Sequence, residues 1–179
     1  MNNLSFPEKE SLEQKREKRI LSIEGEEESR KLANLKDLQK VQYIYTSSYV
    51  MSIGTAKYLA KHLELELNIR LELGERVLGN LGDKRIRMIN ELQENDFDYK
   101  LQGGESLNEV KKRMVRFIRD IVNKHEDKTV ALFTHNVAIT CLLSEWCTKG
   151  FNLDNRLILN SRDEAIIDGA WAGINTIEL

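Results

Sequence analysis

The residue whose type and position best suit chemistry is His135. It follows the apolar run Val130 to Thr134 and precedes a stretch with a helical pattern, Val137 to Cys147. A buried strand that turns at once into a helix places the intervening side chain at the carboxyl edge of a parallel sheet, where open α/β folds bind ligands. An imidazole at that edge can exchange a proton or donate a hydrogen bond near neutral pH. For a histidine taken alone, a hydrogen-bonded structural role is the more common one.

Glu75 and Arg76 form a second candidate pair. They lie in a stretch with three glycines, Gly74 to Gly82, whose backbone could approach a ligand closely. Taken alone, the two residues are most simply an ion pair on an exposed turn, which contributes little to stability. The remaining histidines, His62 and His125, fall late in helical patterns and are expected at the surface near helix C-termini.

Alternating strands and helices must position these residues. Ser22 is expected to cap a helix, and the capping box from Ser106 to Glu109 opens a long one. Strands are expected at 41–46, 65–69 and 130–134, with helices after Ser47-Ser48 and over 83–95. This alternation predicts a three-layer α/β/α sandwich around a mostly parallel sheet. Apolar segments at 157–159, 165–167 and 174–177 are expected to be strands that flank or close the sheet.

Length and composition predict a single soluble domain. The chain has 179 residues, of which 41% are hydrophobic and 31% charged, enough for one good core over residues 1–179. Residues 1–19 are polar and dense in mixed charge, so we expect a solvated helix, a flap or a linker there. A formal net charge of −2, spread along the whole chain, favours neither a nucleic acid nor a membrane as partner.

The cysteines and the N-terminal residues predict a cytoplasmic protein. Cys141 and Cys147 lie in an apolar helical pattern without metal-ligand spacing, so we expect reduced core thiols and neither a disulfide scaffold nor a zinc site. The chain shows no signal-peptide pattern and no apolar run near the roughly 18 residues of a membrane span.

Four short motifs occur in a recognisable order. They are Ser47-Ser48 followed by Thr55-Ala56, Glu75 within Gly-Glu-Arg-Val-Leu-Gly, Gly104-Glu105-Ser106, and Thr134-His135. In this order the chain resembles the histidine phosphatase superfamily, the phosphoglycerate mutase-like proteins, over about residues 20–139. The resemblance implies a phosphoglycerate mutase-like fold. It also implies phosphoryl transfer from phosphomonoesters through phosphohistidine, with no cofactor and no metal.

The resemblance assigns a role to each candidate residue. His135 corresponds to the second, non-nucleophilic histidine, which donates a hydrogen bond to the phosphoryl oxygens. Glu75 corresponds to the proton donor for the leaving oxygen, and Arg76 to a cation on the substrate side. Ser47 would line the phosphate pocket, and the backbone N–H of Asn136 could add to the anion site.

Two departures from the family pattern predict an incomplete active site. The family's strand ending in Arg-His-Gly, which supplies the nucleophile and one arginine, is absent from these 179 residues. Met51 stands where the family carries its second phosphate-binding arginine, and a thioether cannot make a bidentate, charge-assisted contact. We therefore expect little or no phosphatase activity from the chain as it stands.

Two hypotheses follow. In the first, a strand ending in Arg-His lies upstream of Met1 and completes an enzyme that acts on a small phosphorylated metabolite; the nucleotide sequence upstream tests this. In the second, which Met51 favours, the chain is a non-catalytic relative that binds a small anion or a protein partner. If the fold persists without the first strand, the N-terminal segment or a second copy of the chain could fill its place, giving a homodimer.

Overall fold

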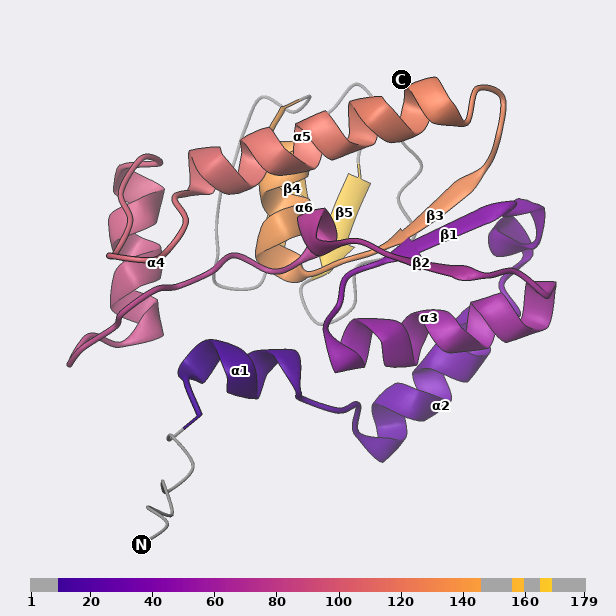
Figure 1. Ribbon diagram of the computed structural model, residues 1–179, viewed down its shortest axis with the longest axis horizontal. Coiled ribbons are helices and arrows are strands. Elements are labelled where there is room, and N and C mark those ends of the chain that lie inside the picture. The colour runs from indigo at the N-terminus through magenta and orange to yellow at the C-terminus, as the bar shows by residue number, and fades with distance from the viewer. Residues whose placement is uncertain (1–9, 146–155, 160–164, 169–179) are drawn as a thin grey trace, which may run out of the picture.

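A small parallel sheet forms the centre of the molecule. The computed structural model describes residues 10–145, 156–159 and 165–168. The sheet has the strand order β2-β1-β3, with β1 at Tyr43–Thr46, β2 at Leu67–Ile69 and β3 at Val130–Phe133 (Figure 1). β1 pairs in parallel with both neighbours, and Ile44 lies opposite Leu67 and Ala131. The three strands therefore end at one edge, as the sequence predicted.

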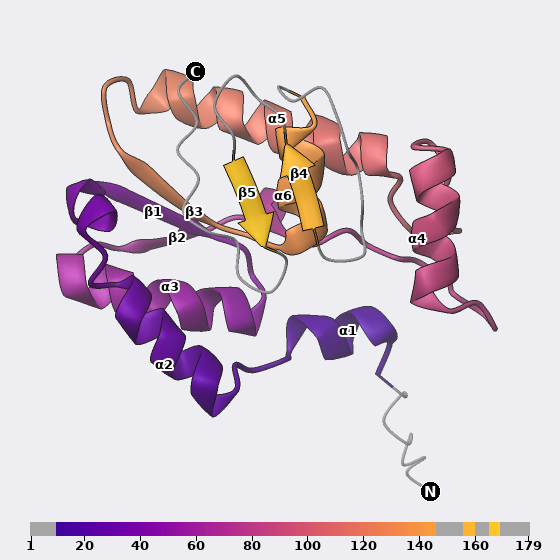
Figure 2. The same cartoon turned by 180° about the vertical axis from the view of Figure 1, so that it is seen from behind.

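Helices cover both faces of this sheet. α2 (Ile23–Leu32) and α3 (Val50–Leu63) lie on one face, and α5 (Leu107–Lys124) lies on the other with α6 (Asn136–Leu143) (Figures 1 and 2). Two core clusters result, because alternate strand residues point to opposite faces. Ile44 packs with α3, whereas Tyr45 packs with α5 and α6. The structure is a three-layer α/β/α sandwich.

Both predicted N-caps are present. The Ser22 hydroxyl accepts a hydrogen bond from the amide of Gly25 at 3.1 Å, and Ser106 and Glu109 form the reciprocal capping box of α5. These caps satisfy amide donors that have no partner within the first helical turn. α4 occupies Ile86–Asn95, slightly shorter than predicted.

Some boundaries differ from the sequence prediction. α2 ends at Leu32, and Leu38 belongs to a separate 3-10 turn, η1 (Lys36–Lys40), which packs it into the core. A second 3-10 turn, η2 (Leu71–Leu73), leads from β2 into the glycine-containing loop. The leucines at 32, 35 and 38 recur every three residues, a spacing that fits both types of helix, so the sequence alone does not separate α2 from η1.

The described part of the C-terminal region corrects another expectation. β4 (Arg156–Leu159) and β5 (Ala165–Asp168) pair antiparallel with each other, in a two-stranded sheet separate from the three-stranded one. The predicted strand at 174–177 and Cys147 lie outside the described residues. No helix of the described residues is long and apolar enough to cross a membrane.

The N-terminal segment forms a short helix that contacts the rest of the molecule. α1 (Leu12–Glu17) buries no residue, yet Glu13 accepts a hydrogen bond from the amide of Leu78 at 2.8 Å. Arg16 donates to the main-chain oxygen of Arg76 at 3.1 Å. Within residues 10–19, the expected flap is therefore hydrogen-bonded to the loop that follows η2.

Candidate active site

His135 and Ser47 meet at the carboxyl edge of the sheet. His135 follows β3 and is the N-cap of α6. Ser47 follows β1, the strand that pairs with β3. The imidazole Nε2 lies 2.7 Å from Ser47 Oγ. The amide of Tyr49 donates to the same hydroxyl at 3.3 Å, so the hydroxyl proton is free to point at Nε2. Which of the two groups donates this hydrogen bond depends on the tautomer of the ring.

The surroundings of His135 keep the ring neutral. Burial is the main cause, and the positive charges of Arg16 and Arg113 act in the same direction; together they lower the pKa of His135 to about 4. The Tyr49 ring packs against the imidazole, with centroids 4.4 Å apart. Burial raises the pKa of Tyr49 to about 12. At neutral pH both groups are therefore uncharged hydrogen-bonding groups.

The Glu75 carboxylate lies at the start of the helix that His135 caps. Its oxygens accept from the amides of Val137 at 3.3 Å and Ala138 at 3.1 Å, and one of them also accepts from the amide of Arg76 at 2.8 Å. The first amides of a helix bind anions because they have no partner in the helix and lie at the positive end of its dipole. The structure thus brings Glu75 and His135 together at one helix N-terminus, although 60 residues separate them.

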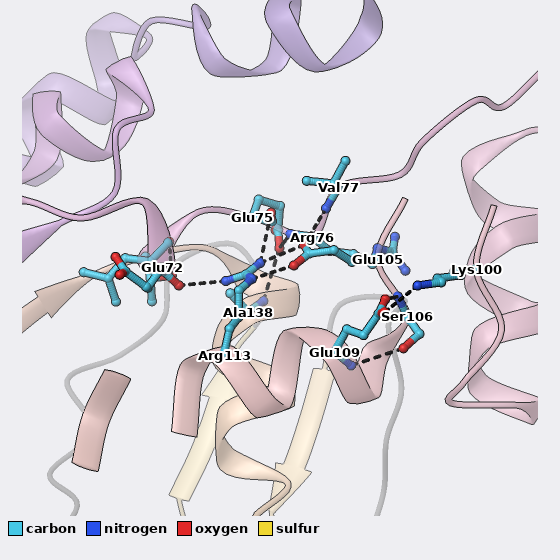
Figure 3. A network of polar contacts seen from close by, with 12 residues as sticks. Glu72, Glu75, Arg76, Val77, Lys100, Glu105, Ser106, Glu109, Arg113 and Ala138 are labelled. Atoms are coloured by element: carbon cyan, nitrogen blue, oxygen red, sulfur yellow. Dashed lines mark hydrogen bonds and ion pairs between the residues drawn. The ribbon is translucent and has the colours of Figure 1, made fainter. Parts of the chain in front are cut away.

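Arg113 of α5 fixes the loop that carries Glu75. Its guanidinium donates to the main-chain oxygens of Glu72 at 2.7 Å and Glu75 at 3.3 Å (Figure 3). The same group forms an ion pair with Glu105 at 2.7 Å, and Glu105 in turn accepts from the amide of Val77 at 3.0 Å. The Gly-Glu-Ser segment before α5 therefore holds the glutamate loop as well as starting a helix.

The side chain of Arg76 contacts α4. Its side chain is buried, and the guanidinium donates to Gln93 and, at 2.8 Å, to Asn90. Burial lowers the pKa of Arg76, and its Nε has no hydrogen-bond partner among the described residues. These contacts are structural, and a role for this cation toward a substrate stays a prediction.

The other predicted positions have clear places. Asn136 begins α6 and is exposed, and its amide precedes the two that hold Glu75. Met51 lies in the first turn of α3, half-buried, close in sequence to Ser47 and Tyr49. Cys141 is a buried free thiol of α6, and burial raises its pKa to about 12.

The sequence prediction for His125 was wrong. His125 is buried, and its Nε2 lies 2.8 Å from the hydroxyl of Tyr45, with the Tyr43 ring centroid 3.9 Å away. Burial, and secondarily the charge of Lys124, lower its pKa. The residue lies at the C-terminus of α5 as predicted, but the rings of Tyr43 and Tyr45 pack against it.

Two cations near the site were missed by sequence reasoning. Arg16 belongs to the predicted polar flap, and Arg113 belongs to the basic run Lys111-Lys112-Arg113, a pattern typical of a solvated helix face. A local signal for Arg113 existed, because its ion-pair partner Glu105 lies two turns away, just before the helix. No local pattern distinguishes Arg16 from its basic neighbours.

Comparison with known proteins agrees with this architecture. The sequence profile of the histidine phosphatase superfamily (branch 1) matches residues 8–164. No curated protein matches the chain.

Several solved structures share the fold. A putative alpha-ribazole-5'-P phosphatase from Escherichia coli aligns with a TM-score of 0.63 and 16% identity, covering 89% of each chain. Mycobacterial glucosyl-3-phosphoglycerate phosphatase aligns with a TM-score of 0.61 and 20% identity, covering 76% of this chain and 74% of that one. Bacillus stearothermophilus YhfR gives a TM-score of 0.61 and 24% identity over 72% and 68% of the two chains. By its profile match over most of its length, the chain belongs to branch 1 of the histidine phosphatase superfamily.

Proposed function

We propose that this chain binds the phosphoryl group of a small phosphorylated metabolite at the start of α6 and turns it over slowly or not at all. One observation carries the proposal: the Glu75 carboxylate and the His135 imidazole meet at a helix N-terminus on the carboxyl edge of the sheet. The buried thiol of Cys141 suits a reducing compartment, so we expect this function in the cytoplasm.

The amides at the start of α6 support anion binding. They already hold two oxygens of the Glu75 carboxylate, which is the arrangement an oxyanion needs. A phosphoryl group entering this place would compete with the Glu75 carboxylate for these amides, or it would share a proton with that carboxylate. Sharing a proton is what the proposed role of Glu75 as proton donor to a leaving oxygen requires. The imidazole of His135, Ser47 and the amide of Asn136 are the further groups that we assign to this site.

A single imidazole supports the expectation of low turnover. Transfer through phosphohistidine needs a nucleophilic histidine besides the one that stabilises charge. Of the chain's three histidines, His62 is exposed on α3 and bonds to Gln39, and His125 is buried against Tyr45. Loss of even one preorganised contact of this kind costs on the order of 10²-fold in rate.

The Ser47–His135 pair has the spacing of a nucleophile and its base, but we assign it a positioning role. A nucleophile must reach the reacting atom, and the side chain of Ser47 is fully buried. Its hydroxyl instead holds the orientation of the imidazole, as partners of functional histidines commonly do.

Titration with inorganic phosphate and with vanadate tests the proposal. The mycobacterial glucosyl-3-phosphoglycerate phosphatase has been solved with inorganic phosphate and with VO3, which suggests these two probes. We expect saturable shifts of the His135 ring signals in nuclear magnetic resonance spectra, and the loss of these shifts in Ser47→Ala. Absence of binding in the folded wild-type protein would reject the anion site and favour the alternative of a protein-binding relative.

A turnover assay tests the second half of the proposal. The purified chain should hydrolyse a generic phosphate ester no faster than its His135→Ala variant. Turnover that disappears in that variant would show that the chain is a phosphatase as it stands.

A further inference from the structure

Resting on the proposed function, we infer that Arg16 of α1 is the cation that recognises the phosphoryl group, and that α1 is the element that brings it to the site. By the resemblance described above, Met51 stands where the family carries its second phosphate-binding arginine, so the proposed site needs a different source of positive charge. Arg16 is the described cation whose geometry fits that role.

α1 is held on the glutamate loop by two contacts. Glu13 accepts from the amide of Leu78 at 2.8 Å, and Arg16 Nη1 donates to the main-chain oxygen of Arg76 at 3.1 Å. These bonds fasten the helix to the loop one and three residues after Glu75, whose carboxylate contacts α6. The position of Arg16 relative to Glu75 is therefore set by hydrogen bonds rather than by chance.

Arg16 has hydrogen-bond donors to spare. Its Nη1 makes all of the hydrogen bonds that the guanidinium forms with described residues, to Glu13 and to Arg76. Nε and Nη2 have no such partner, and the side chain keeps 27% of its surface exposed. Free N–H groups of one planar guanidinium suit the oxygens of a phosphoryl group.

The other two arginines near the site lack this freedom. Arg113 uses Nε, Nη1 and Nη2 on Glu105 and on the main-chain oxygens of Glu72 and Glu75. Arg76 is buried against α4. Arg16 also acts electrostatically on both aromatic groups of the site, since its charge disfavours the protonated form of His135 and lowers the pKa of Tyr49 against the effect of burial.

The Glu13 carboxylate competes with a bound anion for Arg16. The two side chains form an ion pair at 3.1 Å, and both are only partly exposed. Glu13→Gln keeps an oxygen for the amide of Leu78, so α1 can stay docked, but it removes the competing charge. Phosphate should then bind more tightly, which a purely structural Arg16–Glu13 pair would not produce.

The test measures affinity for inorganic phosphate by calorimetry or by the shift of the His135 signals. Arg16→Gln should weaken binding by about tenfold or more, since it removes a charge-assisted contact. Arg16→Lys should restore part of the lost affinity, because lysine keeps the positive charge but lacks the planar guanidinium. Glu13→Gln should strengthen binding roughly threefold. Arg19→Gln, an equal loss of charge at an exposed residue of the same segment, should change affinity less than twofold.

The outcomes separate this inference from the proposed function. Wild-type binding that is unchanged in Arg16→Gln would overturn the role of Arg16 and leave the anion site in place. Equal weakening in Arg16→Gln and Glu13→Gln would also overturn it, because both would then act by loosening α1. Failure of the wild-type protein to bind phosphate would overturn the proposed function and this inference together. Circular dichroism of each variant checks that the fold is intact.

Discussion

At the scale of single residues, the site combines a carboxylate and an imidazole that the protein holds by different means. Glu75 accepts hydrogen bonds from amides at a helix N-terminus, whereas burial and two arginines hold His135 in its neutral form. A bound phosphate dianion would act against this effect on His135, because a nearby negative charge raises the pKa of an imidazole. The same contacts determine how stability depends on pH and on each side chain.

The neutral His135 predicts a loss of stability in acid. The unfolded chain takes up a proton near pH 6.5, whereas the folded chain resists protonation down to about pH 4. Between these values the unfolded state binds more protons, so the free energy of unfolding falls as the pH falls. In urea titrations at pH 7 and pH 4.5, His135→Asn should lose less stability on acidification than the wild type. An equal loss in both proteins would contradict the assigned cause.

Glu75 should contribute to stability through the start of α6. Glu75→Ala leaves the amides of Val137, Ala138 and Arg76 without this acceptor, and we expect a loss of about 1–2 kcal/mol, the range for a missing helix cap. Glu75→Gln should lose less, since one oxygen remains. Urea unfolding measures both.

Glu72→Ala is the matched control for this series. Glu72 lies in η2, just before that loop, with an exposed side chain, and contributes only its main-chain oxygen to Arg113. If Glu72→Ala cost as much stability as Glu75→Ala, the loss could not be attributed to the helix cap.

At the scale of elements, a close backbone contact joins the glutamate loop to the turn before α5. A methyl group on Gly79 would lie 2.5 Å from the main-chain nitrogen of Gly104, and Gly79 also has a φ of 78°. The amide of Asn80 donates to the main-chain oxygen of Gln102 at 3.0 Å, so the two segments run against each other. Together with Arg113 and Glu105, this contact fixes where the loop after η2 lies.

Two glycines of this loop separate the cost of a steric overlap from the cost of backbone strain. Gly82 has a φ of 54° but nothing near its missing side chain, so Gly82→Ala should cost about 1 kcal/mol. Gly79→Ala adds an overlap with main-chain atoms and should cost roughly 1–3 kcal/mol more. The midpoints of urea unfolding give both values, and similar losses for the two variants would contradict the close approach.

At the scale of the whole molecule, one three-stranded sheet lies between two core clusters. Ile44 and Tyr45 are successive residues of β1, yet they belong to different clusters on opposite faces. Among the described strands, β3 pairs only with β1, and its residues are all partly exposed. Cooperation between the two faces therefore depends on β1, the central strand.

Joint stabilisation by both clusters predicts a single unfolding transition. Leu59→Ala, on the α3 face, and Met114→Ala, on the α5 face, should each cost about 2–5 kcal/mol, since both side chains are fully buried. Each variant should accelerate amide hydrogen exchange in α3 and in α5 alike. Val122→Ala, at a residue with 43% of its surface exposed, is the control and should cost less than about 1 kcal/mol. Exchange that rises only on the mutated face would contradict the prediction of one domain.

The sequence by itself determined the elements and the sheet edge. The apolar run before His135, the caps at Ser22 and Ser106, and the order of four motifs are local features, and they predicted the α/β/α sandwich and the family. These features can be read along the chain because hydrogen bonds and hydrophobic periods within one element depend on near neighbours.

Only the tertiary structure decided which charges surround the site. Arg16 and Arg113 act on His135, whereas Arg76, the neighbour of Glu75 in sequence, bonds to α4. His125 is buried by Tyr45, far from it in the chain. The direction of a long polar side chain depends on partners that folding brings from other segments, and electrostatic effects follow distance in space rather than in sequence.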